Sequence, residues 1–383
     1  MHINNTENDF GGELGYANIK LSELYMKRAL IITFFDEINY GAVLQSYAML
    51  TKLQEYYREV NIINYQPAVM KAKRKLLRLD SLKAFVLSII LFPQNAKRQR
   101  VFSRFITKHL SVKDLSILQN DDTRYENDVF LGSDQIWNPR ITGGADPVFF
   151  GIIPTLTRRK TIAYAPSFGV NNLTENELKE ISLFLSQVDN LSVREQEAKN
   201  LISSTSEKEV QVVCDPTLLL KANEWEGFVR KPIVKKDYVF IYSLSQDTEV
   251  LNVATKLAQS LHIPVIEGYL GRKPKGTSSN HRVLFALSPE EFLGYIYNSR
   301  FVVTDSFHGT VFSIIFHKTF YSVPFKGKEG RVKDLLTRCG LSNRIVSSGD
   351  DLNLDELIDY NHVDKALSLF REQSIKYIEE CIL

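Results

Sequence analysis

The sequence predicts an α/β protein of two doubly wound domains that face a cleft. Short runs of β-branched and aromatic residues alternate with longer stretches of helical apolar spacing. This alternation restarts at Asp237, after a junction over 222–236 that contains Trp225 and Pro232. The 383 residues are also more than one ordinary core holds. Two successive rounds of strand and helix therefore indicate two domains with a site between them.

The expected elements divide the chain into four parts. We expect an N-terminal extension over 1–27, an N-terminal domain over 28–225, a C-terminal domain over 237–350 and a helical segment over 351–383. Strand-like runs begin at Ala29, Val60, Asp128, Lys160, Asn190, Val210, Tyr238, Pro264 and Phe301. Helical spacing predicts helices over 42–57, 175–188, 248–261, 289–298, 311–316, 332–339 and 363–380.

Composition excludes several classes of protein. A formal net charge of +2 leaves no general excess of basic residues for nucleic acid. The cysteines Cys214, Cys339 and Cys381 are widely spaced, so neither a disulfide framework nor a zinc site is expected, and the reducing cytoplasm is the expected location. No apolar run has the length of a membrane span and no signal-peptide core is present, which also favours a soluble intracellular protein.

One segment, 71–104, departs from this balance. An apolar stretch over 84–92 lies between clusters of basic residues, and Asp80 is the one acid in the segment. Such a segment can lie at an anionic membrane surface or meet a lipid-linked substrate, or it can form two ordinary helices with solvated charged faces. The basic residues are Lys71, Lys73, Arg74, Lys75, Arg78, Lys83, Lys97, Arg98, Arg100 and Arg104.

The stretch Phe301 to Phe320 is the strongest candidate for a site. A buried strand is followed by the capping residues Thr304, Asp305 and Ser306, and then by an apolar helix with His308 in its first turn. The first turn of a helix attracts phosphate or carboxylate. The alternative is a satisfied core histidine beside a plain cap.

A second polar cluster follows the strand that ends at Gly132. Trp137 is surrounded in the sequence by Ser133, Asp134, Gln135 and Asn138. The polar side chains offer hydrogen bonds for hydroxyls, and the tryptophan offers a flat apolar face for a sugar ring. The alternative is a capped turn with the tryptophan in the core.

Further candidates lie at other strand ends. Gly41 stands at a strand-to-helix junction, where it lets backbone approach a ligand closely. Arg194 follows a strand and could bind an anion or pair with Glu195 or Asp215. The basic loop with Lys326, Lys328 and Arg331 could close on an anion or simply be solvated.

Six ordered motifs carry a resemblance to the polysaccharide pyruvyl transferase family, over about Ala29 to Leu341. One small departure from the family pattern is Pro166, where a small residue such as alanine is expected. The motifs are NYGAVLQSYAM (39–49), LGSDQIWNP (131–139), YAPSFG (164–169), LSVRE (191–195), CDPTLLL (214–220) and VTDSFHGTVFSIIFHK (303–318).

The resemblance implies two Rossmann-like domains in a glycosyltransferase-B-like arrangement. It also implies transfer of pyruvate from phosphoenolpyruvate, as co-substrate, onto a sugar of a cell-surface or capsular polysaccharide precursor as a cyclic ketal. The acceptor could be a lipid-linked oligosaccharide, with the protein peripheral at the inner face of the membrane. No metal and no other cofactor is implied.

The resemblance also implies roles for individual residues. His308, Asp134 and Asp305 are the catalytic candidates, with His308 as acid or as stabiliser of the leaving phosphate and either aspartate as base. Donor-binding candidates are Arg194, Ser306, His308, Gly309, Thr310, Lys328 and Arg331. Acceptor-binding candidates are Asn39, Tyr40, Gly41, Gln45, Ser133, Gln135, Trp137 and Asn138.

Two other functions fit the same sequence. A glycosyltransferase that uses a nucleotide sugar would share the implied fold, since fold does not fix function. A non-catalytic carbohydrate-binding protein would share it too. Saturable binding of a nucleotide sugar would favour the first of these.

Overall fold

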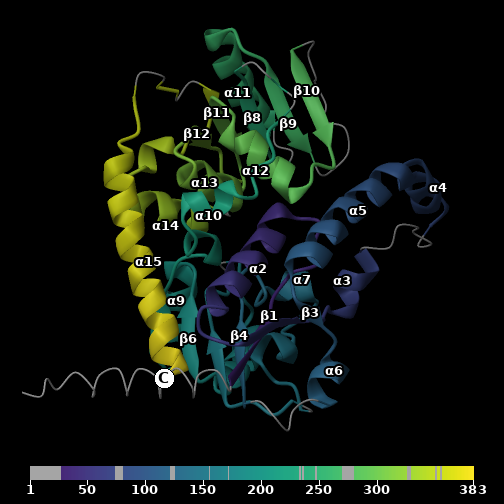
Figure 1. Cartoon of the computed structure of the whole chain (residues 1–383), viewed down its shortest axis with the longest axis vertical. Helices are drawn as coiled ribbons and strands as arrows, with labels where there is room; N and C mark the ends of the chain where they lie inside the picture. Colours follow the sequence, from purple (N-terminus) through teal and green to yellow (C-terminus); the bar gives the residue numbers. More distant parts are fainter. Residues whose placement is uncertain are drawn as a thin grey trace, which may run out of the picture.

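The protein has two α/β lobes stacked along the long axis of the molecule (Figure 1). The computed structural model describes residues 27–73, 81–120, 126–154, 156–170, 172–232, 234, 237–245, 248–269, 280–325, 329–349, 352–353 and 356–383. The expected N-terminal extension up to residue 26 and the candidate Lys328 therefore lie outside the described residues.

The N-terminal lobe contains a seven-stranded sheet in the order β3-β2-β1-β4-β5-β6-β7. All of its paired strands are parallel, and Ile31 of β1 pairs with Phe130 of β4. The strands are β1 (Lys27–Ile32), β2 (Glu59–Ile63), β3 (Val112–Lys113), β4 (Glu126–Leu131), β5 (Lys160–Ala163), β6 (Asn190–Val193) and β7 (Val210–Val212).

The C-terminal lobe contains a five-stranded parallel sheet in the order β10-β9-β8-β11-β12. The sequence patterns predicted β8, β9 and β11, whereas β10 and β12 were not anticipated. The strands are β8 (Val239–Tyr242), β9 (Val265–Tyr269), β10 (His281–Phe285), β11 (Phe301–Thr304) and β12 (Thr319–Ser322).

Helices connect these strands, as the alternating pattern predicted. In the N-terminal lobe they are α2 (Tyr40–Leu53), α3 (Ala68–Lys73), α4 (Leu82–Ile90), α5 (Phe92–His109), α6 (Leu115–Asn120), α7 (Pro139–Thr142), η1 (Pro147–Phe150), α8 (Glu175–Leu185), α9 (Gln196–Ser203) and η2 (Pro216–Leu218). The others are α10 (Ala222–Glu226), α11 (Thr248–Leu261), α12 (Pro289–Tyr297), α13 (Phe307–Ile315), α14 (Gly330–Arg338), η3 (Ser342–Arg344) and α15 (Tyr360–Ile382). None of these helices is long and apolar enough to cross a membrane, among the residues described.

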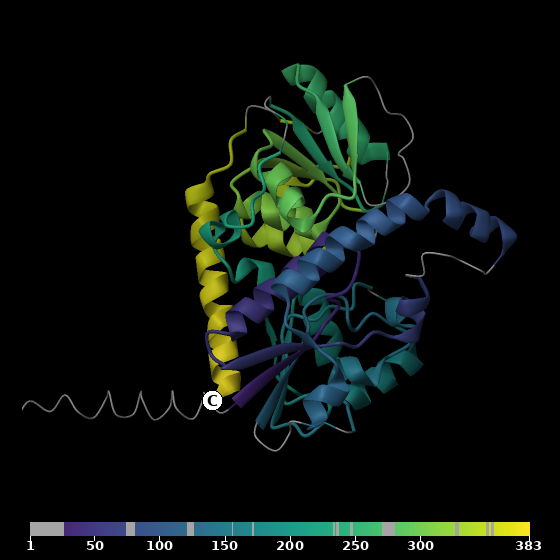
Figure 2. The ribbon, with the colours of Figure 1, turned by 45° about the vertical axis from the view of Figure 1, so that its right-hand side comes forward.

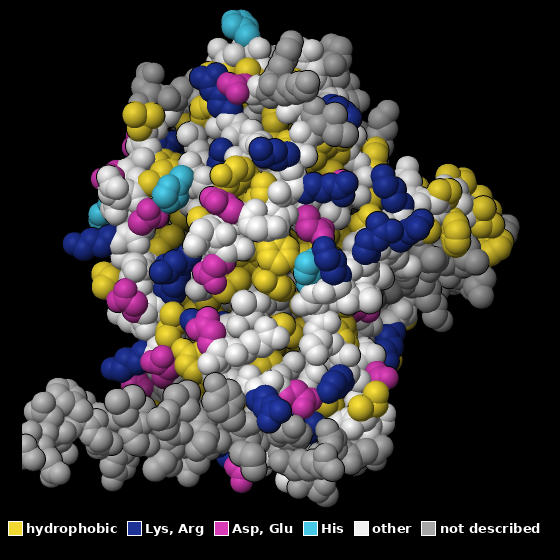
Figure 3. Space-filling view, in the orientation of Figure 1, with side chains coloured by type: hydrophobic (Ala, Val, Ile, Leu, Met, Phe, Trp, Pro, Cys, Tyr) yellow, Lys and Arg dark blue, Asp and Glu magenta, His cyan; other side chains and the backbone are white. Residues whose placement is uncertain are grey.

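Two long helices lie at opposite sides of the molecule (Figures 1 and 2). The helix α15 runs along one side of both lobes, and its end returns to the N-terminal sheet. On the opposite side α5 leads outward to α4, which stands away from the rest of the molecule. A space-filling view shows hydrophobic side chains at this outer end (Figure 3).

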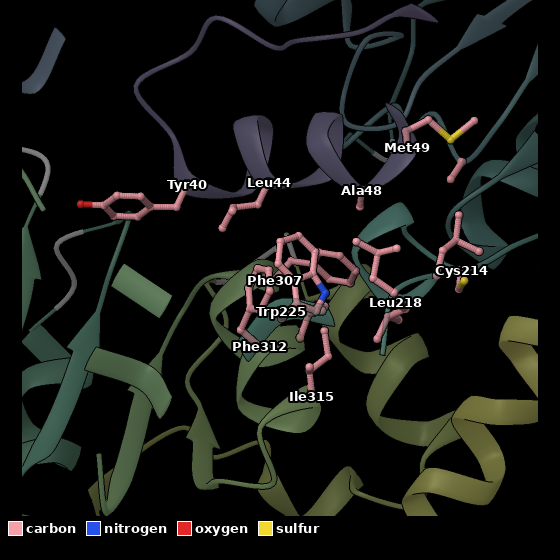
Figure 4. Close-up of a cluster of buried hydrophobic side chains, with 14 of the residues drawn as sticks. Tyr40, Leu44, Ala48, Met49, Cys214, Leu218, Trp225, Phe307, Phe312 and Ile315 are labelled. Carbon is pink, nitrogen blue, oxygen red and sulfur yellow. The ribbon is translucent and has the colours of Figure 1, made fainter. Parts of the chain in front are cut away.

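One hydrophobic core is shared by the two lobes. Leu44 and Ala48 of α2 point toward Trp225 and the α13 side chain of Phe312 (Figure 4). The ring of Trp225 lies 5.0 Å from that of Phe312 at nearly a right angle, the favoured edge-to-face geometry. This shared packing holds the carboxyl ends of both sheets toward one cleft.

Candidate functional site

Polar side chains gather where strands of both sheets end. Asp134 follows β4, Arg194 follows β6, Asp215 follows β7, and His308 lies beyond β11 in the first turn of α13. Ligands of open parallel sheets bind at this edge. A cavity of about 300 Å³ opens there between the lobes. It is lined by Asn39, Asp134, Gln135, Leu244, Ser245, Asp305, Ser306, Phe307, His308, Phe325, Arg331 and Val332.

The buried pair Arg194–Asp215 lies next to His308, one of the residues that line the cavity. An Nη1 donor of Arg194 lies 2.8 Å from Oδ2 of Asp215. The backbone N–H and the hydroxyl of Thr217 both donate to the other carboxylate oxygen. Burial alone would raise the pKa of Asp215, but His308, Arg194 and Thr217 outweigh it and hold that pKa far below its usual range. Asp215 is therefore a fixed anion.

His308 lies directly above that anion. Its Nε2 is 3.5 Å from Oδ2 of Asp215 and has no hydrogen-bond partner in the structure. Ser306 caps α13 by accepting a hydrogen bond from the backbone of Gly309. The face of the imidazole packs on Gly41, where an added Cβ would lie 2.0 Å from Nδ1. The close approach predicted for Gly41 is thus an approach by His308 of the other lobe.

Two arginines converge on the ring of Phe307. The guanidinium carbon of Arg194 lies 4.7 Å from the ring centre, and that of Arg331 lies 5.9 Å from it. Burial lowers the pKa of Arg331, and the Arg194 cation lowers it further. Nε and Nη2 of Arg194 are buried without a hydrogen-bond partner. Oε2 of Glu195 lies 3.7 Å from this Nε, beyond hydrogen-bond distance. Guanidinium groups with free donors can bind a phosphate or a carboxylate in a bidentate manner.

Two carboxyl groups lie beside these cations. Asp134 has a backbone φ of 72°, in the left-handed region that only a few non-glycine residues adopt. Its Oδ1 lies 3.9 Å from Nη2 of Arg194. Burial raises the pKa of Glu195, although Arg194 and Arg331 oppose this, and Ser167 donates to its carboxyl group. The site therefore contains Asp215, whose pKa is lowered, and Glu195, whose pKa is raised.

Asp305, predicted as a possible base, bonds to the loop after β8. Its carboxylate accepts hydrogen bonds from the hydroxyls of Ser243 and Ser245 and from the backbone of Leu244 and Ser245. Asp305 lines the cavity, but its contacts hold the loop after β8 in place. Its role as a base stays a prediction.

Two aromatic acceptor candidates are wrong as direct contacts. The Trp137 ring is buried, stacks on Phe150, and donates its N–H to the carbonyl of Phe149. The Tyr40 ring is buried against Phe292, with centroids 4.2 Å apart. Neither ring can offer a face to a sugar, because core side chains already cover it.

The other predicted residues divide between the cavity and its supports. Asn39, Gln135, Ser306 and Arg331 line the cavity. Gln45 and Ser133 are buried, and Oε1 of Gln45 accepts a hydrogen bond from the backbone N–H of Ser133. Supporting positions are Asn138, which caps α7, Gly309, which packs on Thr304, and Thr310, whose hydroxyl donates to the Ser306 carbonyl.

Sequence reasoning did not select Asp215, Glu195, Ser167 or Phe307 as site residues. Asp215 and Glu195 appeared only as possible partners of Arg194. Each of the three polar residues follows a strand end, so the rule that identified Arg194 and Asp134 could have found them. Nothing in the local sequence marks Phe307, because its role depends on two arginines from distant elements. Among the described residues no group of three or more His, Cys, Asp or Glu could hold a metal ion.

Comparison with known proteins identifies both the family and the fold. A family model described as polysaccharide pyruvyl transferase matches residues 39–325. A search of curated proteins finds no match. Among solved structures, a UDP-N-acetylglucosamine 2-epimerase has a TM-score of 0.52 at 10% identity, over 93% of this chain and 95% of that one. The epimerase from Rickettsia bellii has a TM-score of 0.49 at 10% identity, over 94% and 97%.

The E. coli heptosyltransferase WaaC with ADP has a TM-score of 0.41 at 12% identity, over 90% and 99% of the two chains. Likeness at such identities concerns the fold alone. The predicted fold class, two Rossmann-like domains in the glycosyltransferase-B arrangement, is confirmed. The predicted family resemblance is confirmed as well.

Proposed function

Because the chain belongs to the polysaccharide pyruvyl transferase family, we propose that it transfers pyruvate from phosphoenolpyruvate to a sugar of a cell-surface or capsular polysaccharide precursor. The product is a cyclic ketal, and phosphate is released. The observation that carries the proposal is the pair of arginines around Phe307, beside a cavity and with two Arg194 nitrogens that form no hydrogen bond. Phosphoenolpyruvate brings a phosphate and a carboxylate, which match two guanidinium groups and the N-terminus of α13.

The reaction proceeds in two additions at one carbon. A proton adds to the methylene carbon of the enol, which leaves an oxocarbenium centre at the neighbouring carbon. One sugar hydroxyl attacks that carbon and loses its proton. Phosphate then leaves with the electron pair of its C–O bond, and a second hydroxyl attacks and loses its proton. The sum is a ketal and inorganic phosphate, without a redox change.

We assign the groups by their place in the cavity. His308 lines the cavity and its Nε2 lies 3.5 Å from Asp215, so we assign it delivery of a proton or stabilisation of the departing phosphate. Asp134 lines the same cavity from the other lobe and accepts the hydroxyl proton. The ionised Asp215, 3.5 Å from Nε2, holds the imidazole in place. The proposed reaction requires no metal and takes place in the cytoplasm, where the three buried thiols stay reduced.

Calorimetric titration with phosphoenolpyruvate tests this function. Arg331→Gln removes one cation from the cavity while the buried Arg194–Asp215 pair stays intact. We expect at least a tenfold loss of affinity, since a charge-assisted hydrogen bond contributes about 1.5–3 kcal/mol. The matched control is Arg300→Gln, a surface arginine of the same lobe that pairs with Asp237.

The control variant should bind like the wild type. Unchanged affinity in Arg331→Gln would remove the arginine pair as the donor site. Binding of a nucleotide sugar by the wild type, with none of phosphoenolpyruvate, would instead establish the glycosyltransferase reading.

A further inference from the structure

The outer end of α4 exposes apolar side chains to solvent. Val86 is 49% exposed, Ile89 50%, Ile90 67%, and Phe92 at the start of α5 41%. Val86, Ile89 and Ile90 are three and four positions apart, so they share one face of α4. Large apolar side chains gathered in this way on an exposed helix indicate a surface for a partner.

Basic side chains continue from this apolar end along α5. Lys97, Arg100, Arg104 and Lys108 are exposed and spaced by three, four and four residues, which places them on one side of the helix. The sequence contains no acidic residue from 81 to 113. Figure 3 shows Lys and Arg side chains next to the hydrophobic outer end. The arm, defined as residues 81–108, is therefore apolar at its end and cationic along its length.

We propose that this arm docks the protein on the surface of an anionic lipid bilayer. The apolar side chains of α4 enter the boundary between headgroups and acyl chains, and the basic side of α5 contacts anionic headgroups. The nine residues of α4 are too few to span a membrane. A two-fold contact between copies through the same surface would set one basic side against the other, which is unfavourable.

The inner part of the arm packs beside the cleft. Phe102 in the middle of α5 stacks on Tyr40, with ring centroids 5.2 Å apart. Tyr40 follows Asn39, which lines the cavity. Phe102 is ten residues from Phe92, which is roughly 15 Å along a helix. A docked arm thus keeps the cavity near the bilayer, where a lipid-linked sugar would present its hydroxyls. The delivery of such a sugar rests on the proposed function, whereas docking itself does not.

Sedimentation with vesicles tests the docking. The full chain is mixed with vesicles of phosphatidylglycerol and phosphatidylcholine, or of phosphatidylcholine alone. One arm variant is Ile89→Ser with Ile90→Ser, and the other is Lys97→Gln with Arg100→Gln. The matched controls change exposed residues elsewhere: Leu183→Ser with Leu357→Ser, and Lys179→Gln with Lys365→Gln.

We expect binding to the anionic vesicles that weakens at high salt, because screening reduces the attraction of exposed charges. The Lys97→Gln with Arg100→Gln variant should lose on the order of tenfold or more in vesicle affinity, since each basic residue near the surface contributes about a fivefold factor. The Ile89→Ser with Ile90→Ser variant should also lose on the order of tenfold or more, because it removes apolar side chains that enter the bilayer. The controls should bind like the wild type.

Equal sedimentation with neutral and anionic vesicles would overturn the proposal, as would equal losses in arm and control variants. Self-association that the arm substitutions abolish, without vesicle binding, would assign the surface to a second copy instead. Titration of the arm variants with phosphoenolpyruvate separates the two proposals, because loss of docking leaves donor binding unchanged.

Discussion

At the scale of single residues, Gly41 forms a close contact between the lobes. It is the second residue of α2, and the imidazole of His308 lies flat against its Cα. Any Cβ at this position would overlap the ring at distances of 2.0–2.5 Å. The contact therefore fixes how far His308 reaches toward Asp215, and a methyl group would displace the ring or the helix.

Gly41→Ala should reduce both activity and stability. The displaced imidazole loses its alignment with Asp215, and we expect turnover to fall at least tenfold. Overpacking should cost about 1–3 kcal/mol of unfolding free energy, measured by denaturant titration. Gly227→Ala is the control, because its Cβ would meet an ordinary contact at 3.7 Å. Full activity in Gly41→Ala would show that the position of His308 is unimportant.

At the scale of elements, α15 fastens one lobe to the other. Near its start the Tyr360 hydroxyl donates to the Lys318 carbonyl beside β12. Near its end the Tyr377 hydroxyl donates to the Ala163 carbonyl of β5, and Lys160 donates to the Cys381 carbonyl. The predicted C-terminal helix is confirmed, and it packs across both lobes.

Two leucines on α15 allow a matched test of this packing. Leu367 is 5% exposed within the shared core, whereas Leu369, two residues away, is 54% exposed. Leu367→Ala should cost about 2–5 kcal/mol of unfolding free energy, because it leaves a cavity. Leu369→Ala should cost less than about 0.5 kcal/mol. Equal effects, measured by denaturant titration, would mean that α15 does not stabilise the lobes through this face.

The elements that the sequence predicts well are those whose signals are local. The run at 301–304 followed by Ser306 is enough to predict β11, its turn and the start of α13, and the structure has all three. Strand ends likewise located Arg194 and Asp134. These predictions succeed because propensity and capping depend on neighbouring residues.

The predictions that fail depend on distant partners. Trp137 has the local setting of a sugar platform, yet Phe150 covers it, thirteen residues later in the chain. Asp305 likewise stands in a polar turn, yet Ser243 and Ser245, about sixty residues earlier, donate hydrogen bonds to its carboxylate. A sequence pattern shows which groups are polar; only the packing shows which of them are left for a ligand.

At the scale of the whole molecule, the largest hydrophobic cluster belongs to both lobes. It joins Ile31 of the N-terminal sheet, Val302 of the C-terminal sheet and Tyr377 of α15. A second cluster lies within the N-terminal lobe and a third within the C-terminal lobe. Because separation of the lobes would expose the shared cluster to water, we expect the two domains to unfold together rather than one at a time.

The two tryptophans of the chain report on different parts of this arrangement. Trp137 belongs to the cluster of the N-terminal lobe, and Trp225 to the shared one. In Trp137→Phe and Trp225→Phe, the remaining tryptophan's fluorescence should follow the circular dichroism of the same sample through denaturant titration. Coincident curves in both variants are expected for a single cooperative unit. A Trp225 signal that changes at lower denaturant than the circular dichroism would show that the lobes separate before they unfold. The shared cluster would then stabilise the contact between the lobes less than its buried surface indicates.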